Sequence, residues 1–265
     1  MMGYDGPTVR AIRHAAFAAA FAALALGGPG HCAEVPNVAA ASDLQFALPD
    51  LAAAFKRASG RDVRLAFGSS GNFRRQIADG APFELFLSAD ASYIEALARE
   101  QWSADDGVVY AIGRLALFVP QGSPIEPDAA LRGVAAALSD GRLRKFAIAN
   151  PEHAPYGRAA RQVLMRAGLW RAIEPRLVLG ENIGQAAQFA VGGAAQGGIV
   201  AYSLACSPAL AGRGRYVLLP ASQHDPLVQR MALAKRAGAT ARAFYEFLQQ
   251  PAARAIFERH GFEAP

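Results

Sequence analysis

Thiols, histidines and long apolar runs are all scarce in this sequence. Its 265 residues include only two cysteines and five histidines. Two cysteines do not make a disulfide framework, and no histidines or cysteines have the spacing of a zinc site. No run of 18 apolar residues, the length that spans a bilayer, occurs. P-loop and GxGxxG sequences are also missing, so nothing indicates a nucleotide site.

The charged residues form no block of one sign. The formal net charge is +5, and the basic residues are scattered without a run and without interleaved aromatic residues. A nucleic-acid-binding surface would need such a cluster, so we expect no nucleic-acid partner. Hydrophobic residues make up 52% of the chain, which is enough to form a full core.

The first 33 residues have the pattern of a secretory signal peptide. Arg10 and Arg13 precede an apolar stretch over 15–26, and a zone of mostly small residues follows. We therefore expect residues 1–33 to be removed on export and the mature protein to be periplasmic. Cys32 lacks the small and aliphatic residues that precede a lipid-modified cysteine, so we expect no lipid anchor.

Strand and helix patterns alternate along the rest of the chain, as in a doubly wound α/β sheet. The long extended segment 108–119 predicts a crossing between two lobes, and either 216–219 or 227–234 predicts the return. Pro49 predicts a kink in a helix that begins near Ser42. The main predicted strands are 35–41, 61–67, 83–87, 145–149, 177–179 and 198–202, and the main predicted helices are 72–79, 92–100, 158–167, 184–190, 239–249 and 251–260.

At four places a predicted strand leads into a helix through small or hydroxyl residues, namely at 40–43, 68–71, 155–157 and 181–184. A helix N-terminus presents unpaired N–H groups and about half a positive charge. Four such ends, two from each half of the chain, could meet around one anion without any Lys or Arg. The pattern therefore favours a receptor for a small oxyanion over an enzyme.

Each candidate ligand residue also has an ordinary structural interpretation. Ser42, with Gln45 three residues on, fits a capping box, and Ser70 fits an N-cap. Tyr156 could donate a phenolic hydrogen bond to an oxyanion or could close the core. Ile183 offers only its backbone N–H. The sequence alone leaves these alternatives open.

A secreted hydrolase is the competing interpretation. It would use Ser42 or Ser70 as nucleophile together with Asp90, but a nucleophile needs a base within hydrogen-bond reach. Asp90 is better placed to cap the helix that starts at Ser92. His153 beside either serine would favour the hydrolase.

Six motifs and the C-terminal sequence together resemble the periplasmic molybdate-binding proteins of molybdate ABC transporters. The resemblance runs from about Val38 to Phe262, and it depends on the order and spacing of the motifs. They are Ala-Ala-Ala-Ser (39–42), Phe-Gly-Ser-Ser-Gly (67–71), Gln-Ile-Ala-Asp-Gly-Ala-Pro (76–82), Leu-Phe-Leu-Ser-Ala-Asp (85–90), Asn-Pro-Glu-His-Ala-Pro-Tyr-Gly (150–157), Gly-Ile-Val-Ala (198–201) and the ending 244–262.

The resemblance implies a two-lobed periplasmic-binding-protein fold of type II. Each lobe would be a mainly parallel, doubly wound sheet flanked by helices, with the ligand in the cleft. One lobe would comprise residues 34–112 and 224–265, and the other residues 113–223. The resemblance also implies that the protein is not an enzyme, that it has no cofactor, and that its ligand is molybdate or tungstate. The expected partners are a membrane permease and its cytoplasmic ATPase, and we expect a monomer. Sulfate or phosphate is the alternative ligand.

The same resemblance implies the ligand residues. Ser42 and Ser70 would donate from the first lobe, Tyr156 and Ile183 from the second, and Ala41 through its backbone only. Some relatives have a tyrosine at the position of Ala201. Here the tyrosine is Tyr202, which a strand would turn to its opposite face, so we expect Tyr156 to supply the phenol.

A site made only of donors would reject monohydrogen phosphate, because its P–OH group would find no acceptor. The rejection of sulfate must then come from cavity size. Asp43, next to Ser42, could accept a phosphate proton. We expect its side chain to flank the helix end and to point away from the anion.

Overall fold

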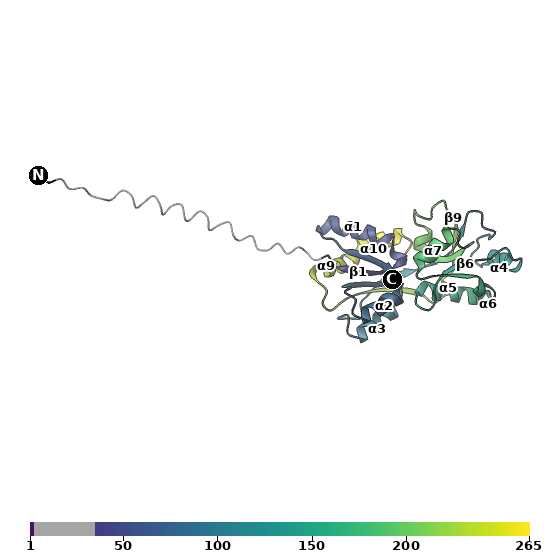
Figure 1. Cartoon of the computed structure of the whole chain (residues 1–265), viewed down its shortest axis with the longest axis horizontal. Coiled ribbons are helices and arrows are strands. Elements are labelled where there is room, and N and C mark those ends of the chain that lie inside the picture. Colours follow the sequence, from purple (N-terminus) through teal and green to yellow (C-terminus); the bar gives the residue numbers. More distant parts are fainter. Residues whose placement is uncertain (3–34) are drawn as a thin grey trace. The chain divides into compact units, whose positions relative to one another are not determined.

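Two five-stranded sheets organise the chain in the computed structural model, which describes residues 1–2 and 35–265 (Figure 1). The predicted signal peptide and Cys32 lie outside the described residues. No helix of the described part is long and apolar enough to cross a membrane.

In the first sheet four strands run in one direction, and one strand, β10, runs against its two neighbours. β1 pairs in parallel with β2 and β3, and β10 pairs antiparallel with β3 and β4. β1 is buried along nearly its whole length, as expected for a strand with helices on both faces. The order is β2 (Arg64–Gly68), β1 (Asn37–Ala41), β3 (Leu85–Ser88), β10 (Leu227–Leu233) and β4 (Val108–Gly113).

The second sheet repeats this arrangement. β6 pairs in parallel with β7 and β8, whereas β5 pairs antiparallel with β8 and β9. β6 and β8 are fully buried, four-residue apolar strands. The order is β7 (Leu177–Gly180), β6 (Phe146–Ala149), β8 (Gly198–Ala201), β5 (Leu115–Pro120) and β9 (Gly214–Leu218).

The helices divide between the two sheets (Figure 1). We call the first sheet with its helices the first lobe, and the second sheet with its helices the second lobe. In the first lobe are η1 (Ser42–Leu44), α1 (Ala47–Ser59), α2 (Ser70–Ala78), α3 (Ala91–Arg99), α9 (Ala239–Leu248) and α10 (Pro251–Arg259). In the second are α4 (Arg132–Ser139), α5 (Pro155–Arg166), α6 (Trp170–Ile173), η2 (Glu174–Arg176), α7 (Ile183–Val191) and α8 (Tyr202–Ala205).

The chain passes twice between the lobes. β4 ends at Gly113 and β5 begins at Leu115, so the long extended segment consists of two strands in different sheets. The return passes through η3 (Ala221–Gln223), which lies between β9 and β10. The predicted two-lobed α/β fold is confirmed.

The region around Pro49 differs from its prediction. The chain forms a short 3-10 turn over Ser42–Leu44, and α1 begins only at Ala47. Pro49 is therefore in the first turn of α1, where its missing N–H costs no hydrogen bond. The predicted kink is wrong because a 3-10 turn and a separate helix, α1, replace one long helix.

Candidate binding site

A small cavity lies where strands of both lobes lead into helices. Its lining comes from the ends of β1, β2 and β3 and from the starts of α5 and α7. Ligands of open α/β sheets bind at such carboxyl ends of strands. The lining contains no Lys, Arg or His. It consists of Ala41, Ser42, Asp43, Gly68, Ser69, Ser70, Ala89, Ala154, Pro155, Tyr156 and Ile183.

All five predicted ligand residues line this cavity, and the structure therefore brings them together. Ala41, Ser42 and Ser70 come from the first lobe, and Tyr156 and Ile183 come from the second. Each is no more than 3% exposed. Their contacts with an anion stay a prediction.

Both serine hydroxyl groups accept a backbone N–H. Ser70 Oγ accepts from Ala89 N at 3.0 Å, and Ser42 Oγ accepts from Gly184 N at 3.1 Å. A hydroxyl has one hydrogen and two lone pairs, and neither hydrogen has an acceptor among the described residues. Both serines therefore retain a hydrogen that can be donated to a ligand.

Ser42 does not cap its own helix, contrary to the capping-box interpretation. Its Oγ binds the second residue of α7 in the other lobe, 142 positions away. The N-cap of η1 is Ala41, which makes no side-chain capping bond. Ser42 therefore connects the two lobes directly above the cavity.

Three α-helices begin at the cavity. Ser70 and Ile183 are the first residues of α2 and α7, and Tyr156 is the second residue of α5. The N–H groups in a first helical turn have no acceptor within their own helix, and the helix dipole makes this end positive. The cavity can therefore hold an anion without a cationic side chain.

Asp43 is at the centre of a buried polar network. The Tyr156 hydroxyl donates to Asp43 Oδ2 at 2.9 Å, and Gln229 Nε2 donates to the same oxygen at 2.6 Å. Gln229 Nε2 lies 3.0 Å from the Tyr156 oxygen, and Gln229 Oε1 accepts from the Tyr110 hydroxyl at 2.6 Å. The network thus joins β4, β10, η1 and α5.

Asp43 does not simply flank the end of a helix, as we expected, but is buried within the site. The residue is 1% exposed and is one of those that line the cavity. Burial raises its pKa to about 6, although hydrogen bonds from Gln229 and Tyr156 act in the opposite direction. Burial and the nearby Asp43 charge also raise the pKa of the Tyr156 phenol well above its usual value. In this network the Tyr156 hydrogen is donated to Asp43.

Gln229 and Tyr110 were not among the predicted site residues. Gln229 is fully buried in β10, and Tyr110 is 5% exposed in β4. A polar side chain within an apolar strand needs a buried partner, so Gln229 within 227–233 is a signal for such a network. The sequence does not identify its partner.

His153 bridges the lobes at the edge of the cavity. Its Nδ1 lies 3.0 Å from Ser69 Oγ, its carbonyl accepts from Gly71 N at 3.0 Å, and its Nε2 lies 3.5 Å from Glu181. Asn72 of α2 also donates to Glu181. These contacts hold the start of α2 against the second lobe.

These contacts do not reproduce the predicted hydrolase. The His153 ring lies within hydrogen-bond distance of Ser69, which caps α2 by accepting from Asn72 N at 3.3 Å, and no hydrogen bond joins this ring to Ser42 or Ser70. Asp90 is the N-cap of α3, as predicted, with Oδ1 accepting from Ser92 N at 2.8 Å. Its other oxygen forms an ion pair with Arg158 of the second lobe.

Tyr202 lies outside the cavity, but the physical reason differs from the predicted one. β8 ends at Ala201, and Tyr202 begins α8 instead of continuing the strand. Its ring packs against Tyr216, with centroids 5.9 Å apart. Tyr156 is therefore the cavity's tyrosine.

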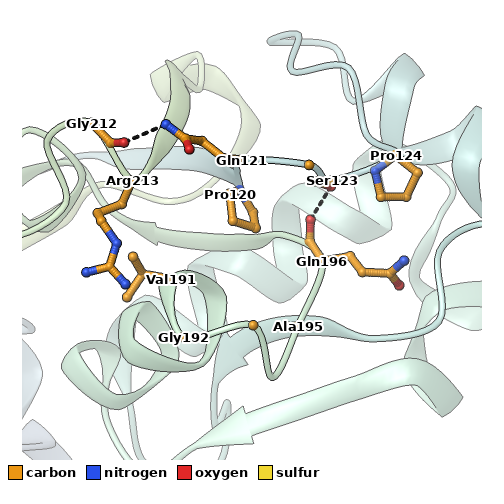
Figure 2. A pocket seen from close by; sticks show the side chains of 12 residues that line it. Pro120, Gln121, Ser123, Pro124, Val191, Gly192, Ala195, Gln196, Gly212 and Arg213 are labelled. Carbon is orange, nitrogen blue, oxygen red and sulfur yellow. Dashed lines mark hydrogen bonds between the residues drawn. The ribbon is translucent and has the colours of Figure 1, made fainter.

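A larger and more open hollow lies elsewhere on the second lobe (Figure 2). Gln121 donates to Gly212 O there and Ser123 donates to Gln196 O, so its polar side chains bind backbone. It contains none of the predicted ligand residues, and Arg213 is its one charged lining residue.

A family model described as "Bacterial extracellular solute-binding protein" matches residues 36–263. The chain belongs to this family. The match supports a location outside the cytoplasm, and it indicates a solute-binding protein and not an enzyme.

Among the relatives of this solute-binding protein, the molybdate-binding protein ModA of Rhodobacter capsulatus is 36% identical over 231 residues. The match covers 85% of this chain and 88% of that protein. The structure of the Azotobacter vinelandii periplasmic molybdate-binding protein has a TM-score of 0.78 and 31% identity, covering 87% of this chain and 99% of that one. The Mycobacterium tuberculosis sulfate-binding protein SubI shares the fold, with a TM-score of 0.72 at 18% identity, covering 87% of this chain and 86% of that one.

Proposed function

We propose that this chain is the substrate-binding protein of an ABC transporter, and that it captures molybdate outside the cytoplasm. One observation carries the proposal: the cavity combines two serine hydroxyls with free hydrogens and three helix N-termini, and it contains no cation. The likeness to molybdate-binding proteins at 31–36% identity over most of the chain supports the choice of ligand.

The chemistry of the lining suits this dianion. Molybdate carries no proton at neutral pH, so all four of its oxygens can accept hydrogen bonds. Ser42, Ser70 and the backbone N–H groups of Tyr156 and Ile183 would supply donors from both lobes. Such donors act strongly in a buried site, because the surrounding protein screens charge less than water does. Tungstate has nearly the same size and charge, so the same donors would bind it.

Binding would be coupled to transport by closure of the lobes. We propose that residues 34–112 and 224–265 move as one body and residues 113–223 as the other. The contacts from Ser42 to Gly184 and from Gly71 to His153 join these bodies around the cavity. A closed, ligand-filled monomer would then be recognised by a membrane permease with its cytoplasmic ATPase.

Isothermal titration with molybdate, tungstate, sulfate and phosphate tests the ligand. We expect one-to-one binding of molybdate and tungstate and no heat from the other two. If only sulfate or phosphate bound, the protein would still be an oxyanion receptor, but molybdate would not be its ligand. If none of the four anions gave binding heat, the proposed receptor function would be refuted.

Ser70→Ala tests the site. Loss of this donor should weaken molybdate binding by about tenfold to a hundredfold, since an unmade buried hydrogen bond costs about 1–3 kcal/mol. Ser92→Ala is the matched control, because Ser92 is an exposed serine in the first turn of α3. Equal affinities of the two variants would contradict the placement of the ligand.

A further inference from the structure

A carboxyl group is an unexpected part of an anion cavity, and Asp43 has one oxygen without a partner. Oδ2 accepts hydrogen bonds from Tyr156 and Gln229, whereas the buried Oδ1 has none. The backbone N–H groups of Asp43 and Leu44 lie close enough to lower the pKa of the Asp43 carboxyl group. Neither N–H group forms a hydrogen bond of normal geometry with Oδ1.

Within the part of the chain that the structure describes, no cationic side chain pairs with this carboxyl group. The groups that face it are the Tyr156 phenol from α5, the Gln229 amide from β10 and, through space, the Tyr110 phenol from β4. All three are neutral at physiological pH, and burial raises the pKa of both phenols. A dianion placed in this cavity would therefore meet an uncompensated negative charge if Asp43 were ionised.

We propose that Asp43 is protonated in the anion complex and that its Oδ1–H group donates a hydrogen bond to the bound oxyanion. Oδ2 would keep its bonds from Tyr156 and Gln229, so the rest of the network needs no rearrangement. The unpartnered oxygen would thereby gain a partner, and the repulsion between the carboxylate and the dianion would vanish. Asp43 would become one more donor in the cavity.

The proposal rests on the proposed function and makes it more specific. Molybdate brings no proton of its own, so an ionised Asp43 must take one from solution, and binding at neutral pH takes up one proton. Monohydrogen phosphate would bring its own proton, which an ionised Asp43 could accept at the same oxygen. Asp43 therefore makes the cavity less discriminating against phosphate than a site made only of donors.

Isothermal titration of molybdate at pH 7.5, in buffers with different ionisation enthalpies, counts the protons. We expect about one proton taken up per molybdate. The affinity of the unmodified protein should fall about tenfold per pH unit between pH 7 and 9, above the Asp43 pKa of about 6. In Asp43→Asn, whose amide can donate without titrating, uptake should drop to near zero and the affinity should not change with pH.

Two further variants identify the titrating group. Asp106 is exposed, and its side chain has no hydrogen bond among the described residues. The Asp106→Asn variant should therefore still take up about one proton per molybdate. His153→Gln should also keep this uptake, although His153 is the ionisable cleft residue next to Ser69.

The possible outcomes separate this inference from the proposed function. Molybdate binding without proton uptake in the unmodified protein would overturn the inference alone. Uptake that survives in Asp43→Asn but disappears in His153→Gln would also overturn it. If molybdate does not bind at all, the proposed function fails, and this inference fails with it.

Discussion

Asp43 should make the stability of the ligand-free protein depend on pH. In the fold its pKa is raised from 3.8 to about 6, with burial as the largest cause. A raised carboxyl pKa means that the folded state holds the proton more tightly than the unfolded state. The stabilisation is fully present below about pH 4 and is lost as the pH rises through 6.

The magnitude follows from the size of the shift. A change of about two pKa units corresponds to roughly 3 kcal/mol, at 1.36 kcal/mol per unit. Asp43→Asn keeps an oxygen that can accept from Tyr156 and Gln229, but it does not ionise. The variant should therefore gain stability relative to the unmodified protein by about 3 kcal/mol between pH 4 and pH 7.

Urea unfolding at several pH values measures this difference directly. Asp106→Asn, an exposed aspartate, serves as the control and should show a much smaller change with pH. A difference between Asp43→Asn and the unmodified protein that stays constant from pH 4 to pH 7 would refute the reasoning. It would show that Asp43 does not experience the burial that the fold indicates.

Two glycines lead to further predictions. In Gly71→Ala the new Cβ would lie 2.5 Å from His153 O in the other lobe, so closure of the lobes should be hindered. Isothermal titration should then show that the affinity for molybdate falls about tenfold or more. The midpoint of urea unfolding should change little. In Gly113→Ala the Cβ would lie 2.3 Å from the Tyr156 hydroxyl oxygen and 2.7 Å from Gln229 Nε2. This variant should lose both affinity and stability, because it displaces the network around Asp43, and urea unfolding measures the second effect.

Different results would contradict these two predictions. Unchanged affinity in Gly71→Ala would mean that binding does not need the contact between α2 and His153. Full affinity together with full stability in Gly113→Ala would mean that Tyr156 and Gln229 can move without cost.

Much of the fold could be predicted from local sequence. β1, β3 and β6 are short apolar runs, and such runs indicate strands buried on both faces. The helices that start at Ser70 and Ile183 are preceded by Ser69 and Asn182, and both residue types are typical of N-caps. α4 had no predicted counterpart, and its N-cap, Leu131, offers no capping side chain.

The cavity was predictable in outline but its network was not. Ser42 looked like the cap of its own helix, because the sequence does not show that Gly184 would be its partner. The sequence led us to expect that the Asp43 side chain flanks the end of its helix and points away from the anion. Its hydrogen-bond partner Gln229 lies 186 positions away, in β10 of the first sheet. Contacts between residues so distant in sequence depend on how the sheets are assembled, and no local pattern encodes them.

The most direct test of the binding site is a crystal structure of the molybdate complex, with the molybdenum located by its anomalous scattering. We predict one molybdenum site between the lobes, with molybdate oxygens within hydrogen-bond distance of Ser42 Oγ, Ser70 Oγ and Asp43 Oδ1. A molybdenum site elsewhere, for example in the hollow beside Arg213, would contradict the account.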